Sequence, residues 1–327
     1  MVGLRIAGTG SYLPDEIIGN DFFAGRAMRK YSSSGGVLEE KIIDPEKIFD
    51  LTGIRERRKA RADEHPSDMG YVAAVRAIEK AGVDAGSIVG IYLASVSESC
   101  NFPNGATKIQ RKLGIRGSCS SCDVVNACAG FTEALMQARA RNFTRKGNYL
   151  VVASERLTNL IDYTDINATL FGDGAGAALL VPCDDNQGIV GEYSITEPHD
   201  GNDMLIFRDK QGFLRMPEGG TVLRKAVRGM ITAAEEIKNG LGWTHADVYI
   251  PHQANARIIQ GVEKAVKEKS PESIVYSTIH KYGNMSSATC AIALDEALRD
   301  GTIEEGDKVI VASFGSGLVT SAVGIQF

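Results

Sequence analysis

Two segments of the chain share one pattern of residues and lie about half the chain apart. Each begins with a glycine, continues through a short approach and an apolar run, and ends in Ala-Ser, at residues 147–154 and 306–313. The two final serines are 313 − 154 = 159 residues apart in a chain of 327 residues. An internal repeat of this size predicts two halves of similar structure.

The residues around the repeat extend the correspondence. A helix-patterned run precedes each segment, at residues 131–141 and 289–298, and a glycine-rich turn leads into another apolar run, at 175–181 and 319–325. Strands and helices that follow one another in this order predict an α/β fold with two similar βαβ-containing halves. We expect an active site between the halves, where strands end and helices begin.

The boundary between the halves is predicted in the polar, turn-rich stretch 182–188. The first half then comprises residues 1–184 and the second half residues 185–327. A hydrophobic content of 43% is ordinary for a globular chain of this length, and it is compatible with two packed halves.

Cys128 is the first candidate for a catalytic residue. It lies between two alanines, beside Gly130, and directly precedes the helix-patterned run 131–141. The N-terminus of a helix presents unpaired N–H groups and the positive end of the helix dipole, which favour a thiolate and can hold an oxyanion. The alternative is a small buried cysteine that fills a tight corner.

His252 and Asn284 would supply the base and the amide that the chemistry needs besides the helix dipole. Ionising most of a free thiol at neutral pH requires lowering its pKa by about two units, or about 2.7 kcal/mol, whereas a helix dipole typically contributes about 0.3–1 kcal/mol. A neighbouring imidazole is therefore needed, and an amide can direct N–H groups at a substrate carbonyl. Singly, His252 reads as a structural histidine and Asn284, in a Gly-Asn pair, as a turn residue. Their occurrence together with Cys128 favours catalysis.

The chain resembles the β-ketoacyl-ACP synthase III family of thiolase-fold condensing enzymes, where ACP is the acyl carrier protein. The resemblance runs nearly from end to end, through segments 8–14, 52–57, 126–131 and 171–177 and the segments around His252 and Asn284. It implies the five-layer αβαβα arrangement of the thiolase-like fold. It also implies a cytoplasmic homodimer.

The family resemblance implies a decarboxylative Claisen condensation of an acyl thioester with malonyl-ACP, giving a β-ketoacyl-ACP. Cys128 would be the acylated nucleophile, and His252 and Asn284 would hold the thioester carbonyl of the malonyl extender. The backbone N–H groups of Cys128 and Ser316 would form the oxyanion hole. The substrates would be acyl-CoA or acyl-ACP and malonyl-ACP, with no metal or dissociable redox cofactor. Both fatty-acid initiation and a specialised pathway fit this chemistry.

Four basic residues resemble the face on which the family binds its carrier protein. They are Arg224, Lys225, Arg257 and Lys264. An acyl carrier protein is strongly acidic, so a local basic patch would steer it even toward a chain of net charge −5. The alternative is that these are ordinary solvated charges on helices.

Three positions depart from the family pattern. Lys47 and Asn159 stand where well-studied members have a tryptophan and an arginine that enclose the adenine of coenzyme A, and Leu51 replaces a further arginine. Losing these contacts removes roughly 0.5–2 kcal/mol for a cation–π pair. We therefore expect coenzyme A to be bound differently or not to be the favoured donor. Residues 30–47 form an insertion whose alternative interpretation is a solvated surface loop.

Composition and cysteine spacing exclude several other classes. The negative net charge argues against nucleic acid as the main partner, and no apolar run approaches the roughly 18 residues that a membrane helix needs. The N-terminus lacks the layout of a signal peptide. Six cysteines in a chain this long do not indicate a disulfide scaffold, and the pair Cys119 and Cys122 has no matching second pair for zinc.

Two related enzyme classes are excluded, and two others remain as alternatives. A thiolase would need a second reactive cysteine near the C-terminus, and residues 291–327 contain none. A hydroxymethylglutaryl-type synthase would need a glutamate base, and no glutamate has that context in the sequence. The same cysteine would also serve a type III polyketide-synthase-like enzyme or an acyltransferase that works without ACP extension.

Overall fold

The computed structural model describes residues 2–100, 102–184, 186–198 and 204–327, whose framework is two five-stranded sheets. The first sheet has the order β1 (Val2–Tyr12), β9 (Asp173–Asp184), β8 (Asn148–Arg156), β6 (Ile88–Ala94), β7 (Ser120–Val124). The second has the order β10 (Gly188–Thr196), β16 (Val319–Gln326), β15 (Lys308–Gly315), β13 (Val248–Pro251), β14 (Ile274–Val275).

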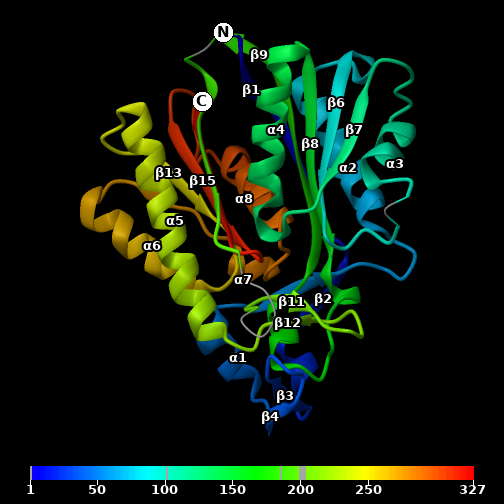
Figure 1. Cartoon of the computed structure of the whole chain (residues 1–327), viewed down its shortest axis with the longest axis vertical. Coiled ribbons are helices and arrows are strands. Elements are labelled where there is room, and N and C mark those ends of the chain that lie inside the picture. The colour runs from blue at the N-terminus through cyan, green and yellow to red at the C-terminus, as the bar shows by residue number, and fades with distance from the viewer. Residues whose placement is uncertain (1, 101, 185, 199–203) are drawn as a thin grey trace.

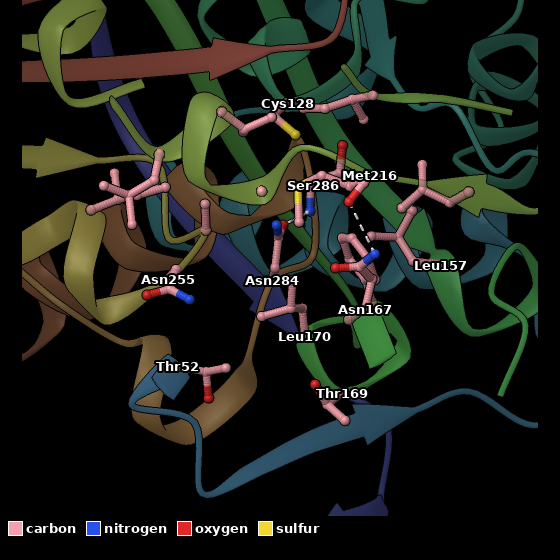
Figure 2. Close-up of a pocket in the computed structure, with 18 of the residues that line it drawn as sticks. Thr52, Cys128, Leu157, Asn167, Thr169, Leu170, Met216, Asn255, Asn284 and Ser286 are labelled. Atoms are coloured by element: carbon pink, nitrogen blue, oxygen red, sulfur yellow. Dashed lines mark hydrogen bonds between the residues drawn. The ribbon is translucent and has the colours of Figure 1, made fainter. Parts of the chain in front are cut away.

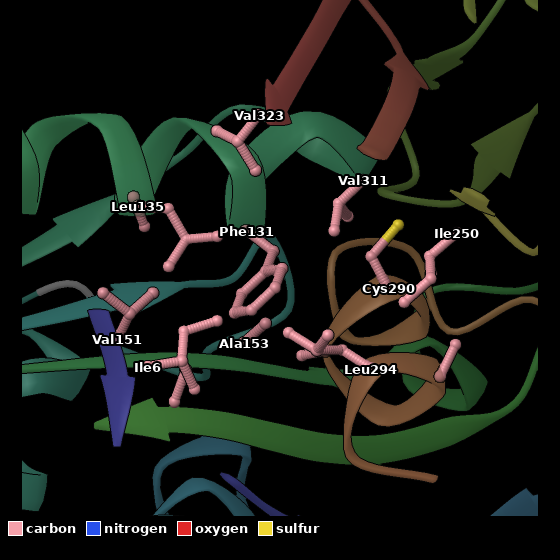
Figure 3. Close-up of a cluster of buried hydrophobic side chains, with 14 of the residues drawn as sticks. Ile6, Phe131, Leu135, Val151, Ala153, Ile250, Cys290, Leu294, Val311 and Val323 are labelled. Carbon is pink, nitrogen blue, oxygen red and sulfur yellow. The ribbon is translucent and has the colours of Figure 1, made fainter. Parts of the chain in front are cut away.

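Two helices lie between the sheets and form the central layer (Figure 1). They are α4 (Gly130–Thr144) and α8 (Ala288–Arg299). Figure 3 shows Phe131 and Leu135 of α4 and Leu294 of α8 packed among side chains of both sheets. Because α8 contacts both sheets, ten of its residues are buried. α8 therefore lacks the polar face of a surface helix.

The outer faces of the two sheets carry the other long helices. α2 (Pro66–Ala81) and α3 (Gly105–Lys112) cover the first sheet, and α5 (Gly219–Leu241) and α6 (Ala256–Lys269) cover the second (Figure 1). Each pair of helices forms one apolar core with the sheet that it covers. The result is the predicted five-layer αβαβα fold.

The internal repeat corresponds to matching strands in the two sheets. β8 pairs antiparallel with β9 and parallel with β6, and β15 pairs antiparallel with β16 and parallel with β13. The polar residues 182–184, predicted as part of a turn, instead extend β9 and pair with β1. The predicted boundary falls at residue 185, which lies outside the described residues.

The N-terminal segment adds small elements at the end of the molecule where α1 lies (Figure 1). β2 (Glu16–Gly19) pairs with β5 (Glu56–Lys59), and β3 (Ala27–Tyr31) pairs with β4 (Val37–Ile42). The predicted insertion is therefore largely a β-hairpin, followed by α1 (Pro45–Thr52). α1 ends at Gly53, where φ is 71° and an added Cβ would lie 2.3 Å from that of Ala256, so only glycine fits.

The remaining elements are short. They are β11 (Phe207–Arg208), β12 (Leu214–Arg215), α7 (Ile279–Tyr282), and the 3₁₀ helices η1 (Asn20–Phe23), η2 (Ala85–Ser87), η3 (Ala127–Ala129), η4 (Leu157–Asn159) and η5 (Ile166–Leu170). Across the described segments, no helix combines the length and apolar character needed to span a membrane.

Candidate active site

Cys128 lies in η3, one turn before α4 begins, and small residues fix its position. Ala127 has a φ of 45°, in the left-handed region. A Cβ added to Gly130 would lie 2.9 Å from that of Ala94, and one added to Gly315 would lie 3.0 Å from the Cys128 nitrogen. The glycines therefore let β6 and the end of β15 approach the cysteine closely.

His252 follows β13 and is 2% exposed. Its backbone N–H donates to the Ala312 carbonyl at 2.8 Å, and its Nδ1 lies 2.7 Å from Thr289 Oγ1. Burial lowers the pKa of His252 to about 3, so the imidazole is neutral at physiological pH. One ring nitrogen is thus held by Thr289, which leaves Nε2 for chemistry.

Asn284 lies between α7 and α8 and is 6% exposed. Its backbone N–H donates to the Leu170 carbonyl at 2.8 Å, and its carbonyl accepts from the Gly172 N–H at 3.0 Å. The side-chain Oδ1 accepts from the Ser286 N–H at 2.8 Å. Because this bond occupies the amide oxygen, it directs the NH₂ group toward a ligand.

A cavity of about 710 Å³ brings these three residues together with Ser316. Figure 2 shows Cys128, Ser286 and Asn284 on the same part of its wall. Most of the remaining wall is apolar, and includes Leu157, Leu160, Ile166, Leu170, Phe171, Ile206, Leu214, Met216, Val222, Leu223, Met230 and Phe314. The cavity is large enough for a small organic ligand, and the three candidate catalytic residues lie on its wall.

Ser316 lies in the turn between β15 and β16. Its hydroxyl donates to the Ile206 carbonyl at 2.6 Å, which ties this turn to the segment that enters β11. Ser316 lines the same cavity as Cys128, and the adjoining Gly315 packs against the Cys128 nitrogen. The expectation that the backbone N–H groups of Cys128 and Ser316 form one oxyanion hole stays a prediction.

The predicted carrier-binding residues are distributed over two helices. Arg257, at the start of α6, lines the exposed end of the cavity. Arg224 and Lys225 lie near the start of α5, where Lys225 forms an ion pair with Glu197 at 2.9 Å. Lys264 lies farther along α6. Arg257 is thus placed at the cavity, whereas the other three lie beside it on the surface.

Only two of the three positions that depart from the family pattern lie at the cavity. Lys47 and Leu51 of α1 line its exposed end. Asn159 is exposed and lines a separate, smaller cavity together with Arg156 and Arg208. The expectation that Lys47, Leu51 and Asn159 change how coenzyme A is bound stays a prediction.

The expected influence of the helix dipole on Cys128 is outweighed by burial. Burial raises the pKa of the Cys128 thiol to about 12, although hydrogen bonds from Ser286 and the backbone act in the opposite direction. A raised pKa favours the protonated thiol at neutral pH, whereas the contribution of the helix start to the thiolate stays a prediction. Its reaction needs a group that accepts the proton.

Glu155 is a further candidate that the sequence did not reveal. It is the second-last residue of β8 and is fully buried, and its Oε2 accepts hydrogen bonds from Ser97 Oγ at 2.5 Å and the Val96 N–H at 3.1 Å. Its Oε1 accepts from Ser287 Oγ at 3.0 Å. Burial raises the pKa of Glu155 to about 7. The sequence signal for this residue is an acid near the end of a buried apolar strand.

Across the segments that the structure describes, no group of three or more His, Cys, Asp or Glu side chains is arranged to hold a metal ion. Cys119 and Cys122 are both free thiols.

Comparison with known proteins places the chain among condensing enzymes. Two family profiles match, 3-oxoacyl-[acyl-carrier-protein (ACP)] synthase III at residues 122–198 and the C-terminal region of the same synthase at residues 237–327. A β-ketoacyl-[acyl-carrier-protein] synthase III of Xanthomonas axonopodis pv. citri is 35% identical, with 99% of this chain and 98% of that protein covered. One from Halalkalibacterium halodurans is 36% identical, with 100% and 99% covered.

Solved structures of similar proteins have the same fold. The 3-oxoacyl-[acyl-carrier-protein] synthase III of Aquifex aeolicus superposes with a TM-score of 0.87 at 31% identity, covering 99% of this chain and 100% of that one. The priming β-ketosynthase of the R1128 polyketide pathway superposes with a TM-score of 0.86 at 30% identity, covering 99% and 96%. OleA of Xanthomonas campestris, at 19% identity and a TM-score of 0.80, shares the fold.

Proposed function

The chain belongs to the 3-oxoacyl-[acyl-carrier-protein] synthase III family of condensing enzymes, and we propose that it joins an acyl group to malonyl-ACP with loss of carbon dioxide. The observation that carries this proposal is the single cavity that contains Cys128, His252 and Asn284 together. A thiol, an imidazole and an amide are the groups that acyl transfer and enolate stabilisation require.

In the first half-reaction, the sulfur of Cys128 attacks the carbonyl carbon of an acyl thioester. The backbone N–H groups of Cys128 and Ser316 stabilise the oxyanion that forms, because both lie at the cavity. The carbon–sulfur bond to the carrier breaks, the carrier thiol takes up the proton that Cys128 has lost, and the acyl group remains on Cys128.

In the second half-reaction, malonyl-ACP occupies the cavity and loses its carboxylate as carbon dioxide. The NH₂ group of Asn284 and Nε2 of His252 stabilise the thioester enolate, since Oδ1 of Asn284 and Nδ1 of His252 have protein partners. The enolate carbon attacks the acyl group on Cys128. The bond to sulfur breaks, and one proton restores the Cys128 thiol.

The partners follow from this chemistry. An acidic acyl carrier protein would bind over the exposed end of the cavity, where Arg257 lies, with Arg224, Lys225 and Lys264 on neighbouring surface. Catalysis by a thiol and by decarboxylation needs no metal or dissociable redox cofactor. The expected location is the cytoplasm, without a membrane or nucleic-acid partner.

The edge of the first sheet supports a homodimer as the working form. β7 is the last strand of that sheet, and the neighbouring side chains of Val125 and Phe102 are 70% and 91% exposed. An exposed strand edge beside large apolar side chains is suited to pairing with a second copy. Sedimentation of the purified protein tests this, and a monomer at micromolar concentration contradicts it.

A specialised pathway remains a second candidate for the physiological role. The structures of a fatty-acid-type synthase and a polyketide-priming synthase superpose on this chain almost equally well, with TM-scores of 0.87 and 0.86. The donor acyl group therefore decides between the two roles. A type III polyketide-synthase-like reaction or a plain acyl transfer would appear as product formation without malonyl-ACP.

The proposal is tested by the intact mass of the protein after incubation with acyl-CoA and acyl-ACP donors of different chain length. We expect one acyl group on the wild type and none on Cys128→Ala, because the substitution removes the only nucleophile assigned at the cavity. Cys290→Ala is the matched control, since Cys290 is a buried thiol on α8 with no assigned role in acyl transfer. Acylation of Cys128→Ala, or of no form with any donor, would overturn the proposal.

A further inference from the structure

A second cavity, of about 360 Å³, adjoins the main cavity that contains Cys128. Val96, Leu160 and Arg208 line both, so the two cavities share part of their walls. The lining of the second cavity also includes His65, Ser97, Glu98, Ser99, Arg156 and Asn159, most of which are polar. The wall of the main cavity is mostly apolar, so a polar group of a ligand is better suited to this second, polar cavity.

Arg156 is a buried cation at the polar cavity. It is 8% exposed, and no described carboxylate forms an ion pair with it. Its Nη1 donates to the Ala62 carbonyl at 3.2 Å, its Nε is buried without a hydrogen-bond partner, and its Nη2 has no partner among the described residues. A buried arginine is normally paired, and an unsatisfied buried donor points to a missing ligand, water or ion.

The carboxylate opposite Arg156 on the neighbouring strand is bonded elsewhere. Asp173 of β9 is the register partner of Arg156 in β8. One of its oxygens accepts from the Thr158 N–H at 2.9 Å, and the other accepts from Thr158 Oγ1 at 2.6 Å and the Ala60 N–H at 2.8 Å. Asp173 therefore satisfies backbone and hydroxyl donors and leaves the guanidinium of Arg156 without a direct counter-ion.

The remaining charges of the polar cavity also favour an anion. Arg208 is exposed, and its Nε donates to the Gly212 carbonyl at 3.0 Å without an ion pair to any described residue. Among the described residues of the lining, Glu98 is the one acid. Its carboxylate is paired with Lys108 at 2.8 Å and accepts from the Ser67 N–H at 2.9 Å. Two arginines thus line a cavity whose carboxylate is already neutralised, and they give it a positive potential.

The polar cavity is open to the surface as well as adjacent to the main cavity. Ser99, Asn159 and Arg208 of its lining are exposed, so a solute can enter between them. Arg208 also lines the main cavity, so its guanidinium lies within reach of a ligand bound there. Both routes lead a ligand to the same pair of arginines.

We propose that the polar cavity binds a carboxylate, held by Arg156 and Arg208. A guanidinium matches the geometry of a carboxylate and forms charge-assisted hydrogen bonds with it. The carboxylate has two sources that the test must separate. One is a free carboxylate that enters from the surface. The other is the far end of a dicarboxylic acyl donor, and this source rests on the proposed function, because the donor would acylate Cys128.

The first arm of the test titrates the whole protein with sodium glutarate by calorimetry, with sodium chloride at equal ionic strength as the blank. A free carboxylate site binds glutarate in the wild type, and Arg156→Met and Arg208→Met weaken that binding at least ten-fold, because each removes a guanidinium. Arg139→Met is the matched control, since Arg139 lines neither cavity and is paired with Glu192 at 3.1 Å.

The second arm compares coenzyme A half-thioesters of dicarboxylic acids, from succinyl to suberyl, with monocarboxylic acyl donors of equal chain length. If the carboxylate belongs to the donor, the wild type is acylated at Cys128 with a higher kcat/KM by one of the dicarboxylic donors than by its match. Arg156→Met should abolish this preference while leaving kcat/KM with the apolar donor within two-fold. A merely structural role of Arg156 would lower both values together.

The outcomes separate the two sources and also the proposed function. Glutarate binding that both arginine variants weaken assigns the site to a free carboxylate, and a donor preference that they abolish assigns it to the acyl donor. If neither variant changes either readout, the proposal is overturned. If Arg156→Met does not fold, Arg208→Met decides, because Arg208 is exposed. If no donor acylates the wild type, the proposed function is wrong, while the glutarate titration still decides whether the site exists.

Discussion

The Thr289 hydroxyl can donate its proton to either of two acceptors. The acceptor that it chooses sets the tautomer of His252. Its hydroxyl lies 2.7 Å from His252 Nδ1 and 2.9 Å from the Ser286 carbonyl. That carbonyl also accepts from the Thr289 N–H at 3.3 Å, so it keeps a partner when the Thr289 hydroxyl turns its proton to Nδ1, which is the orientation that the proposed role of His252 requires. Donation to Nδ1 leaves the ring proton on Nε2, where it can stabilise the enolate oxygen.

Thr289→Val should slow malonyl decarboxylation more than acylation of Cys128. Valine has a similar shape but leaves Nδ1 of a buried imidazole without a partner, which costs about 1–3 kcal/mol or about 5-fold to 150-fold in rate. The measurement compares the release of carbon dioxide from malonyl-ACP with the single-turnover acylation rate. Thr289→Ser keeps the hydroxyl and should restore decarboxylation. Equal slowing of both half-reactions in Thr289→Val would contradict this role for the hydroxyl.

A charged cluster joins three elements over the apolar part of the cavity. Arg215 of β12 bonds to Asp165 at 2.8 Å, Asp209 at 2.8 Å and Asp162 at 3.1 Å, and its guanidinium lies 4.0 Å from the ring centre of Tyr31 in β3. The flanking residues of the same hairpin, Leu214 and Met216, line the cavity. The cluster therefore holds the wall of the acyl cavity against the body of the protein.

Arg215→Met should lower the free energy of unfolding by about 3–5 kcal/mol, because it leaves carboxylates partly buried without their cation. Arg215 is 6% exposed, and burial raises the pKa of Asp165 even with the arginine present. Lys59→Met is the control, since it breaks an exposed pair with Glu16 that is worth about 0–1 kcal/mol. Urea denaturation of both variants measures the difference. A loss of less than 1 kcal/mol in Arg215→Met would show that the cluster does not stabilise the fold.

The sequence predicted elements where the apolar pattern is strong and missed them where it is weak. The runs 131–141 and 289–298 lie within α4 and α8, because these helices are packed on both sides. β4 escaped prediction since every residue in it is exposed and no alternation marks it. Its pairing with β3 depends on the hairpin and on contacts with the rest of the chain.

The three candidate catalytic residues were predictable, but their neighbours were not. Cys128, His252 and Asn284 lie in segments with recognisable composition, whereas Glu155 and Thr289 gain their meaning from contacts across the fold. Glu155 meets Ser287 at a separation of 132 residues in the chain. The high pKa of Cys128 likewise depends on burial, which a helix-start pattern does not report.

Both halves of the molecule contribute to one cavity. The first half supplies Cys128, and the second supplies His252, Asn284 and Ser316. α4 and α8 both begin near this point, which explains why equivalent positions of the repeat meet there. The exposed end of the cavity combines parts of α1 and α6, with Lys47 and Leu51 on one and Arg257 on the other. The carrier-binding site that we propose is therefore formed only when the chain folds.

The last prediction concerns that exposed end. The residues that enclose the adenine in well-studied family members contact adenine and not the acyl group, so their loss would weaken the binding of every coenzyme A donor alike. Lys47 and Leu51 stand where two of these residues are expected. A carrier protein would bind through Arg257 and its basic neighbours instead. For one acyl group, we therefore expect a higher kcat/KM with acyl-ACP than with acyl-CoA.

Charge reversal separates this electrostatic attraction from a general effect of net charge. Arg257→Glu should lower kcat/KM with acyl-ACP by about ten-fold, mainly through slower association, and raising the salt concentration should reduce the wild-type value in the same direction. Lys80→Glu makes the same charge change on α2, over the outer face of the first sheet, and should have little effect. An equal loss of kcat/KM with acyl-ACP in the two variants would show that only the net charge matters. A clear preference of the wild type for acetyl-CoA would show that the altered clamp still binds coenzyme A, and would favour the role in fatty-acid initiation.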